Sequence, residues 1–248
     1  MAEAADAILG PRFRGIMTNI SANLQAVNAR ISAAARAAGR TPESVRLLAV
    51  SKTWPATRVR EAVACGQRIF GENYLQESLP KIAELADLDL EWHFIGPLQS
   101  NKTRAIAERF DWAHTICREK IAARLSAQRP AGMPPLQVCL QVNVSGEAAK
   151  SGVAPEQVPA LARAVAVLPG LKLRGLMAIP EASDDETLLR RRYALLRELL
   201  ARLNGEGMAL DTLSMGMSHD LEAAIAEGAT IVRIGTAIFG TRRKEGTT

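Results

Sequence analysis

Residues 46–53 read RLLAVSKT, a short apolar run that ends at Lys52 and is followed at once by the breaker pair Trp54 and Pro55. Such a run is typical of a buried strand, and the lysine then lies at the mouth of that strand. We expect bulk water to be largely excluded there, which disfavours the ammonium form. Lys52 is therefore a candidate nucleophile that captures a carbonyl group as a Schiff base. A solvated surface lysine is the alternative for this residue taken alone.

Similar segments recur along the whole chain. Apolar or β-branched stretches begin near residues 46, 69, 91, 112, 136, 171, 211 and 230. Amphipathic stretches with helical periodicity lie between them at 56–64, 74–86, 101–109, 118–128, 155–167, 184–203 and 218–227, and a further helix is expected over 17–37, ending at Gly39.

Eight strands alternating with helices in 248 residues predict an α/β fold, a single (β/α)8 TIM barrel with an extra N-terminal helix. An open doubly wound sheet usually carries a glycine-rich turn after its first strand, and this chain has Ser51-Lys52-Thr53 at that place. The sequence contains no linker-like stretch. We therefore expect one barrel domain over residues 15–248 and a flexible tail over residues 1–14.

Composition narrows the classes of function. No run of about 18 apolar residues appears, so we expect no membrane span, and the acidic N-terminus argues against a secretory or transit segment. Cys65, Cys117 and Cys139 are odd in number and lack the spacing of metal ligands. These features predict a protein of the reducing cytoplasm without a disulfide framework or a zinc site.

The net charge of +5 is spread through mixed Arg/Glu helices, and only residues 242–244 form a terminal basic cluster. Aromatic residues make up 4% of the chain, which provides no stacking platform for single-stranded nucleic acid. Small phosphorylated anions are the partners that we expect, and we expect neither nucleic acid nor membrane as a partner. A nucleic-acid or protein adaptor built on a barrel scaffold stays open as an alternative.

Two segments near the end of the chain have the composition of an anion site. In a barrel, phosphate commonly binds at the loops after the seventh and eighth strands. Residues 214–220 read SMGMSHD, in which a glycine allows close backbone approach and Ser218 is expected to cap a helix. Residues 233–240 read RIGTAIFG and again place a hydroxyl beside a glycine. Each segment alone is equally consistent with an ordinary capped turn.

A phosphate at the last two strands and an aldehyde on a lysine of the first strand together indicate pyridoxal 5′-phosphate. The motifs that support this interpretation occur in order along the chain: LLAVSKTWP, FGENYLQE, WHFIGPLQSNK, KSGV, LRGLMAIP, LSMGMSHDLEAAI and VRIGTAIFG. Together they closely resemble the pyridoxal phosphate homeostasis protein family, which is itself similar to the N-terminal barrel of alanine racemase. The resemblance extends from about residue 45 to residue 242.

This resemblance implies roles for particular residues. Lys52 matches the lysine that carries the cofactor as an internal aldimine. Ser218, Gly235 and Thr236 match phosphate-binding positions, with Met217 beside them, and Arg233 matches the arginine that approaches the pyridine nitrogen. His219 replaces a residue that is often acidic or polar in the family, and the N-terminal extension is longer than usual.

Other residues allow two interpretations each. Asn73 could donate a hydrogen bond to the phenolic oxygen of the cofactor, or it could cap a helix. His93 lies between two aromatic residues that point to the opposite face, so it could face the barrel interior and line the pocket, or be a neutral core histidine. Packing roles are expected for His114, Trp54, Trp92 and Trp112. Lys150 and Arg242 could guide the anionic cofactor, or could simply be solvated.

An arginine at the pyridine nitrogen can only donate hydrogen bonds, so the ring stays unprotonated and withdraws electrons weakly. Alanine racemase adds a tyrosine from a second domain, for which this chain has no room after the eighth strand. Tyr74 and Tyr193 fall in predicted helices and are not obvious replacements. We therefore expect a monomeric carrier or regulator of pyridoxal phosphate that supplies apo-enzymes. A pyridoxal phosphate-dependent racemase or decarboxylase is the alternative.

Overall fold

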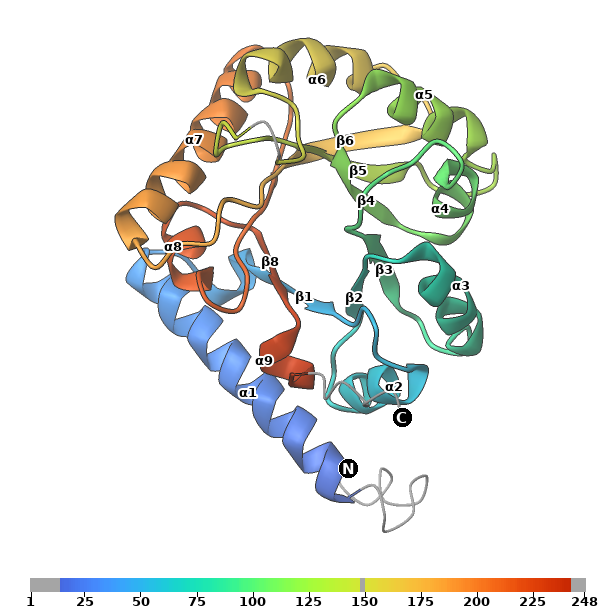
Figure 1. Ribbon diagram of the computed structural model, residues 1–248, viewed down its shortest axis with the longest axis vertical. Helices are drawn as coiled ribbons and strands as arrows, with labels where there is room; N and C mark the ends of the chain where they lie inside the picture. The colour runs from blue at the N-terminus through green and yellow to red at the C-terminus, as the bar shows by residue number, and fades with distance from the viewer. Residues whose placement is uncertain (1–13, 148–149, 242–248) are drawn as a thin grey trace.

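The computed structural model describes residues 14–147 and 150–241, which form a closed barrel of eight parallel strands surrounded by helices (Figure 1). The strands are β1 (Arg46–Val50), β2 (Ile69–Glu72), β3 (Glu91–Phe94), β4 (Trp112–Ile116), β5 (Leu136–Gln141), β6 (Leu171–Met177), β7 (Thr212–Ser214) and β8 (Ile231–Ile234). Each strand pairs with the next, and β8 pairs with β1 to close the barrel. The predicted TIM barrel is confirmed, and every strand begins within one residue of its expected start.

The helices follow the strands in alternation. They are α1 (Arg14–Ala37), α2 (Ala56–Ala64), α3 (Leu75–Glu84), α4 (Thr103–Arg109), α5 (Glu119–Gln128), α6 (Val158–Ala166), α7 (Glu186–Gly205), α8 (Leu221–Ala226) and α9 (Thr236–Phe239), with 3-10 turns at Pro42–Ser44 and Pro155–Gln157. None of the helices in the described part of the chain is long and apolar enough to span a membrane.

Alternation along each strand separates two apolar layers. In β1, Leu47 and Ala49 belong to the large core between the strands and the outer helices. Leu48 and Val50 point the other way and join a smaller core inside the barrel, whose other members are Ile95, Trp112, Cys139, Met177 and Ile231. Because most strand residues are buried on both faces of the sheet, strands such as β1 appear in the sequence as nearly continuous apolar runs.

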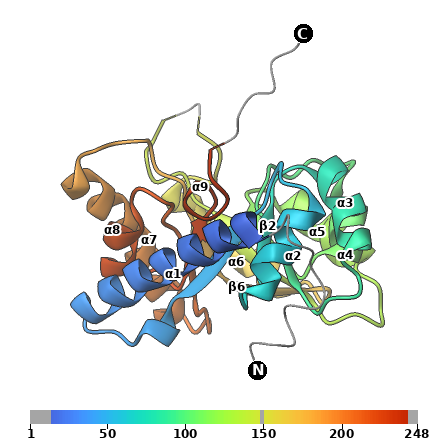
Figure 2. The same ribbon diagram turned by 90° about the horizontal axis from the view of Figure 1, so that it is seen from below.

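Helix α1 runs across the outside of the barrel beside α8 and α9 (Figures 1 and 2). The Nδ2 atom of Asn23 donates to the carbonyl oxygen of Ile238 at 2.8 Å. Two turns further along α1, Arg30 donates to the carbonyl oxygen of Ser218 at 3.1 Å and forms an ion pair with Glu222. Helix α1 therefore holds both segments that were predicted to bind phosphate.

Two local predictions were wrong. The helix expected from residue 218 begins at Leu221, and Asp220 occupies the N-cap position, so Ser218 lies in the preceding turn. Tyr74 lies just before α3 and not within a helix. The expected tail over residues 1–14 lies outside the described residues, apart from Arg14, the first residue of α1.

Candidate functional site

A cavity of about 250 Å³ opens at the carboxyl ends of the barrel strands, where TIM barrels carry their chemistry. Its lining comes from residues at the ends of six of the strands or in the loops that follow them: Val50, Lys52, Asn73, Ile95, Ile179, Met217, Ser218, His219, Arg233, Gly235 and Thr236. Seven of the eight residues predicted to bind the cofactor line this cavity. The exception is His93, which is fully buried deeper in the barrel and is not part of the lining.

Lys52 follows β1 and lies within a loop that buried polar groups hold in place. Its own side chain is exposed, which differs from the expected exclusion of water. The carbonyl oxygen of Ser51 accepts a hydrogen bond from Nζ of Lys81 at 2.9 Å, and Oγ of Ser51 donates to Oε1 of Glu72 at 2.7 Å. These contacts fix the backbone immediately before Lys52.

Lys81 and Glu72 form an ion pair of 2.6 Å that is buried next to this loop. Burial raises the pKa of the Glu72 carboxyl, and the contacts with Lys81 and Ser51 oppose that rise. Thr53 has a φ of 69°, which is unusual for a β-branched residue, and its backbone N–H donates to Oε2 of Glu77 at 3.1 Å. The loop around Lys52 therefore has a defined conformation although the lysine itself is exposed.

Arg233 points from β8 into the inner end of the cavity. Its Nη1 atom donates to the carbonyl oxygen and to Oγ of Ser214 at 2.6 and 2.9 Å, and Nη2 donates to the carbonyl oxygen of Ala178 at 3.0 Å. Burial lowers the pKa of this guanidinium from its ordinary value. The side chain supplies only hydrogen-bond donors to the cavity, because a guanidinium has no acceptor.

The two loops that follow β7 and β8 bring hydroxyl groups to the same cavity. Gly216 has a φ of 92°, and a Cβ atom placed there would lie 2.6 Å from the Cβ of Ala224. A Cβ on Gly235 would lie 3.2 Å from the carbonyl oxygen of Val50. The 2.6 Å distance and the positive φ require glycine at position 216, and Gly235 keeps its loop close to Val50. Ser218 and Thr236, which lie beside these glycines in the two loops, both line the cavity.

Asp220 organises the first of these loops. Its Oδ1 atom accepts a hydrogen bond from the backbone N–H of Met217 at 2.5 Å, and Oδ2 accepts one from the hydroxyl of Tyr193 at 2.7 Å. Burial and the neighbouring Asp220 raise the pKa of Tyr193 well above its ordinary value. Tyr193 therefore remains a neutral donor behind the loop and is not part of the lining.

The remaining candidates lie elsewhere. Lys150 is partly exposed and does not line the cavity, and Arg242 lies outside the described residues. Trp54 stacks on Phe239 with ring centroids 6.1 Å apart, and Trp92 packs against Phe70 at 5.7 Å, so both are packing residues as predicted. In the part of the chain that the structure describes, no group of His, Cys, Asp or Glu side chains could hold a metal ion.

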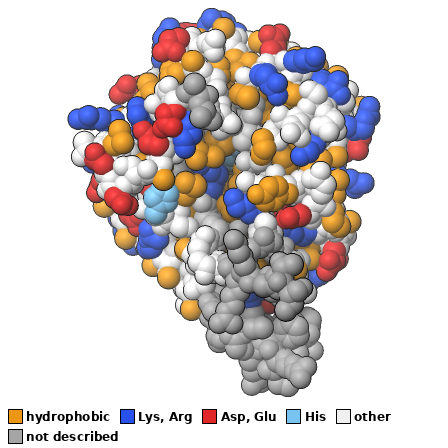
Figure 3. Space-filling view, viewed as in Figure 1, with side chains coloured by type: hydrophobic (Ala, Val, Ile, Leu, Met, Phe, Trp, Pro, Cys, Tyr) orange, Lys and Arg blue, Asp and Glu red, His pale blue; other side chains and the backbone are white. Residues whose placement is uncertain are grey.

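Sequence reasoning missed several residues that form the site. Ile95 and Ile179 add apolar surface to the lining, while Glu72, Lys81, Asp220 and Tyr193 support the loops from behind. Ile95 follows β3 directly and Ile179 follows β6 within two residues, so position at a strand end was an available signal for both. On the face shown in Figure 3, acidic and basic side chains are interspersed, in line with the scattered charge of the sequence.

Comparison with known proteins agrees with this geometry. The family model for the alanine racemase N-terminal domain matches residues 22–243. A pyridoxal phosphate homeostasis protein of Pseudomonas aeruginosa is 67% identical over 226 residues, covering 91% of this chain and 97% of that protein. A protein of the same name from Escherichia coli is 55% identical over 232 residues, covering 91% and 98%. The chain belongs to the pyridoxal phosphate homeostasis protein family.

Solved structures of the family show the same barrel. PipY of Synechococcus elongatus PCC7942 is 39% identical, with a TM-score of 0.80 over 89% of this chain and 100% of that chain. A second structure of PipY, 38% identical, contains bound pyridoxal phosphate. Alanine racemase from Corynebacterium glutamicum, at 18% identity and a TM-score of 0.66, shares only the fold. This chain spans 64% of that racemase, whereas it spans nearly all of its relatives in the family.

Proposed function

We propose that this chain binds pyridoxal 5′-phosphate in the cavity at the carboxyl end of the barrel and acts in pyridoxal phosphate homeostasis as a carrier or regulator. The observation that carries the proposal is the meeting of Lys52, Arg233 and two hydroxyl-bearing loops around one cavity of about 250 Å³. The cofactor has three features that match this arrangement: an aldehyde, a phosphate and a ring nitrogen that accepts a hydrogen bond.

Each feature of the cofactor has a partner among the lining residues. When bound, pyridoxal phosphate supplies an aldehyde that an amine captures reversibly, and Lys52 is the amine in this cavity. The hydroxyl groups of Ser218 and Thr236 and the backbone of Gly235, which all line the cavity, suit the phosphate. Arg233 offers its donors to the ring nitrogen.

Asn73 also fits the cofactor. Its Oδ1 atom is buried and has no hydrogen-bond partner among the described residues, although the side chain lines the cavity. A buried amide oxygen without a partner is costly and can only accept a hydrogen bond, so a ligand that donates an O–H to it is favoured. The phenolic group of pyridoxal phosphate is a suitable partner.

A carrier role is favoured over amino-acid turnover by what surrounds Lys52. Racemisation on an unprotonated pyridine, which withdraws electrons weakly, depends on a well-placed base on each face of the ring. Neither of the two tyrosines lines the cavity: Tyr193 donates its hydroxyl to Asp220, and Tyr74 is an exposed residue before α3. Arg233 provides no proton acceptor for the ring nitrogen, and its charge disfavours protonation there.

The proposal extends to the setting in which the protein works. We infer one barrel domain over residues 15–248 preceded by a short tail. We also infer a monomer that acts in the cytoplasm and transfers its cofactor to apo-enzymes. The exposure of the Lys52 side chain supports transfer of the cofactor, because the amine of an accepting enzyme can approach it.

Absorbance and reductive trapping test the proposal. Loaded protein should absorb near the visible edge, and borohydride should fix the cofactor on the peptide that contains Lys52. Lys52→Ala should lose this adduct with its thermal unfolding unchanged, because the side chain is exposed. Lys172→Ala removes another exposed lysine, which lies near the start of β6 and does not line the cavity, so this matched control should keep the adduct. A label on a different peptide would refute the assignment.

A further inference from the structure

A chain of hydrogen bonds crosses the barrel interior from the cofactor cavity to the amino-terminal ends of the strands. At the cavity, Nη1 of Arg233 donates to Oγ of Ser214 at 2.9 Å. The same Oγ lies 2.8 Å from Nδ1 of His114, and Nε2 of His114 lies 2.8 Å from Nδ1 of His93. The chain therefore links strands β8, β7, β4 and β3 through side chains that face one another.

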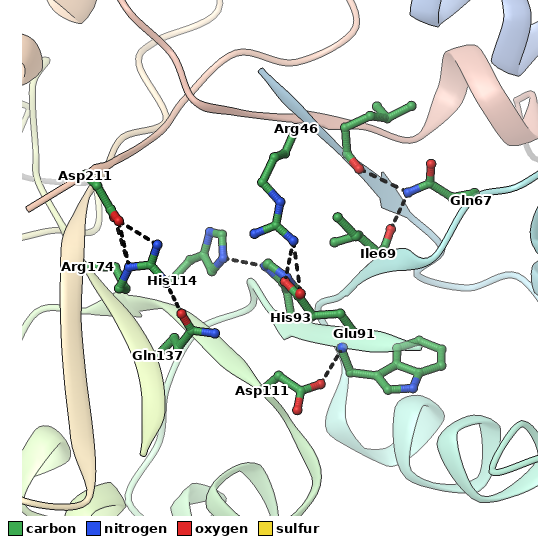
Figure 4. Close-up of polar contacts among 12 residues, drawn as sticks. Arg46, Gln67, Ile69, Glu91, His93, Asp111, His114, Gln137, Arg174 and Asp211 are labelled. Atoms are coloured by element: carbon green, nitrogen blue, oxygen red, sulfur yellow. Dashed lines mark hydrogen bonds and ion pairs between the residues drawn. The ribbon is translucent and has the colours of Figure 1, made fainter. Parts of the chain in front are cut away.

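The far end of the chain is an ion pair. Nε2 of His93 lies 2.5 Å from Oε1 of Glu91, and both carboxylate oxygens of Glu91 lie 2.9 Å from Nη2 of Arg46 (Figure 4). Glu91 and Arg46 are the first residues of their strands, and both line a second cavity of about 580 Å³ at this end of the barrel. We call the following six residues the interior chain: Arg233, Ser214, His114, His93, Glu91 and Arg46.

The middle of the interior chain is isolated from solvent. Ser214, His114 and His93 have no exposed surface. Trp112 stacks on the ring of His93 at a centroid distance of 5.1 Å and an interplanar angle of 9°, so it closes one face of that ring. The polar atoms of the three buried side chains must therefore be satisfied mainly by one another, and each bond depends on its neighbours.

The two ends leave only one direction for these hydrogen bonds. Arg233 can only donate, and an ionised Glu91 can only accept. Burial alone would raise the pKa of Glu91, but its contacts with His93 and Arg46 outweigh burial and lower that pKa to about 2. Burial lowers the pKa of both histidines; Glu91 opposes this effect at His93, whereas His93 and the charges of Arg233 and Arg46 add to it at His114. We infer that both rings are neutral at pH 7.

When both histidine rings are neutral, the position of each proton in the interior chain is determined. Ser214 accepts from Arg233 and donates to Nδ1 of His114. His114 then carries its proton on Nε2 and donates to Nδ1 of His93, which in turn carries its proton on Nε2 and donates to Glu91. The reverse direction would need a donor at the carboxylate and an acceptor at the guanidinium, and neither group supplies one.

We propose that the Arg46–Glu91 ion pair sets the direction of the interior chain and thereby positions the guanidinium of Arg233 in the cofactor cavity. Glu91, His93, His114 and Ser214 are then positioning residues, which act on the cofactor only through Arg233. The inference rests on the proposed function, because it takes Arg233 as the hydrogen-bond donor to the ring nitrogen of the cofactor. It makes the amino-terminal end of the barrel part of the cofactor site, although Glu91 does not line the cavity.

The first test measures the histidine tautomers in the wild-type protein. The chain has three histidines, and ¹⁵N-labelled histidine resonances separate the Nδ1–H, Nε2–H and doubly protonated forms. We expect His93 and His114 to be neutral Nε2–H tautomers without added cofactor. An Nδ1–H or charged ring at either position would overturn the inference, whether or not the protein binds pyridoxal phosphate.

The second test replaces the carboxylate of Glu91, which can only accept hydrogen bonds. In Glu91→Gln the side-chain amide can donate as well as accept, so His93 is no longer held in one tautomer. We expect the His114 resonances to change and pyridoxal phosphate affinity to fall about two- to thirtyfold, the range of coupling through packed networks. Glu91→Asp keeps the carboxylate and should recover most of the affinity.

Asp211→Asn is the matched control. Asp211 is also a carboxylate at the amino-terminal end of the barrel, where it pairs with Arg174 at 2.6 Å without touching the interior chain (Figure 4). This variant should leave both the His114 resonances and the cofactor affinity unchanged. Equal losses in the Asp211 and Glu91 variants would indicate a general structural effect and would overturn the proposed positioning.

The two proposals fail in distinguishable ways. If the wild-type protein does not take up pyridoxal phosphate, the proposed function fails, and the tautomer measurement still tests the interior chain. If it binds pyridoxal phosphate and Glu91→Gln changes neither the His114 resonances nor the affinity, only the positioning fails. Should Glu91→Gln not fold, Ser214→Ala cuts the chain next to Arg233. It should weaken cofactor binding with His93 still in the Nε2–H form, and unchanged binding would overturn the inference.

Discussion

The ammonium group of Lys81 lies 2.9 Å from the carbonyl oxygen of Ser51, the residue immediately before Lys52. A buried lysine thus holds the backbone of the lysine that we propose to bind the cofactor. Glu72 completes the arrangement by accepting hydrogen bonds from both Lys81 and Ser51. The backbone that leads into Lys52 is therefore held by a buried ion pair.

Replacing Lys81 by Met should destabilise the protein strongly, because it leaves the carboxylate of Glu72 buried without its partner. We expect a loss of about 3–5 kcal/mol in the free energy of unfolding, measured by urea denaturation. The double variant Lys81→Met, Glu72→Gln should recover part of this loss. Arg60→Met, which breaks an exposed ion pair with Asp87, should have little effect. A similar small change on replacing Lys81 would show that the buried pair does not support the loop.

Removing a hydroxyl from either phosphate loop should weaken cofactor retention. Ser218→Ala and Thr236→Ala each delete one donor to a charged phosphate, so each should cost about 1.5–3 kcal/mol, roughly ten- to a hundredfold in affinity. Pyridoxal without its phosphate should bind poorly to the wild-type protein and should be insensitive to both substitutions. Equal affinity for pyridoxal and pyridoxal phosphate, measured by fluorescence or absorbance titration, would place the phosphate elsewhere.

The buried histidines should make stability depend on pH. Burial lowers the pKa of His114 well below 6.5, so below pH 6.5 the unfolded chain binds a proton that the folded chain does not. The free energy of unfolding should therefore fall from pH 7 to pH 5. The raised pKa of Glu72 acts in the opposite direction, because the folded state then gains a proton as the pH falls.

Variants separate the contributions of His114 and Glu72 to the pH dependence of stability. His114→Gln should show a smaller decrease in stability from pH 7 to pH 5 than the wild-type protein, since Glu72 titrates in both. His219→Gln removes an exposed histidine and should keep the wild-type decrease. A wild-type pH dependence in the His114 variant would show that this ring is not the group responsible.

The carrier proposal predicts very little chemistry at the α-carbon of amino acids. With Arg233 at the ring nitrogen and no tyrosine in the lining, exchange of the α-proton of alanine in deuterated water should be near background. Arg233→Glu would favour ring protonation, yet racemisation should stay low because the second base is still missing. Transfer of the cofactor to an apo-enzyme should be measurable under the same conditions. Wild-type racemisation at about 1–1000 per second would contradict the proposal.

The barrel could be predicted from the sequence because each strand is buried on both faces. Runs such as Leu47–Val50 are apolar at every position, and the helices between them have a different period. The helix expected at Ser218 was misplaced because two residues that favour N-caps lie close together. In the structure the later one, Asp220, occupies that position.

The contacts behind the site could not be predicted, because they depend on the register between strands. The two interpretations of His93, pocket residue or core histidine, were separated by its complete burial and its absence from the cavity lining, and the register places it beside Trp112 of the neighbouring strand. The same pairing brings His93 to His114 and leaves it below the cavity. Lys81 and Glu72 meet for a similar reason, since the orientation of α3 relative to β2 is a tertiary property.

Contacts of α1 with Ser218 and Ile238 join the beginning of the described chain to its end. During synthesis, α1 and the strand before Lys52 leave the ribosome first, whereas the loops with Ser218 and Thr236 leave last. Lys52 is therefore available long before the cavity around it is complete. The loops with Ser218 and Thr236 can join the cavity only when almost all residues of the chain have been made, and the strand that leads into Thr236, β8, is also the strand that closes the barrel against β1.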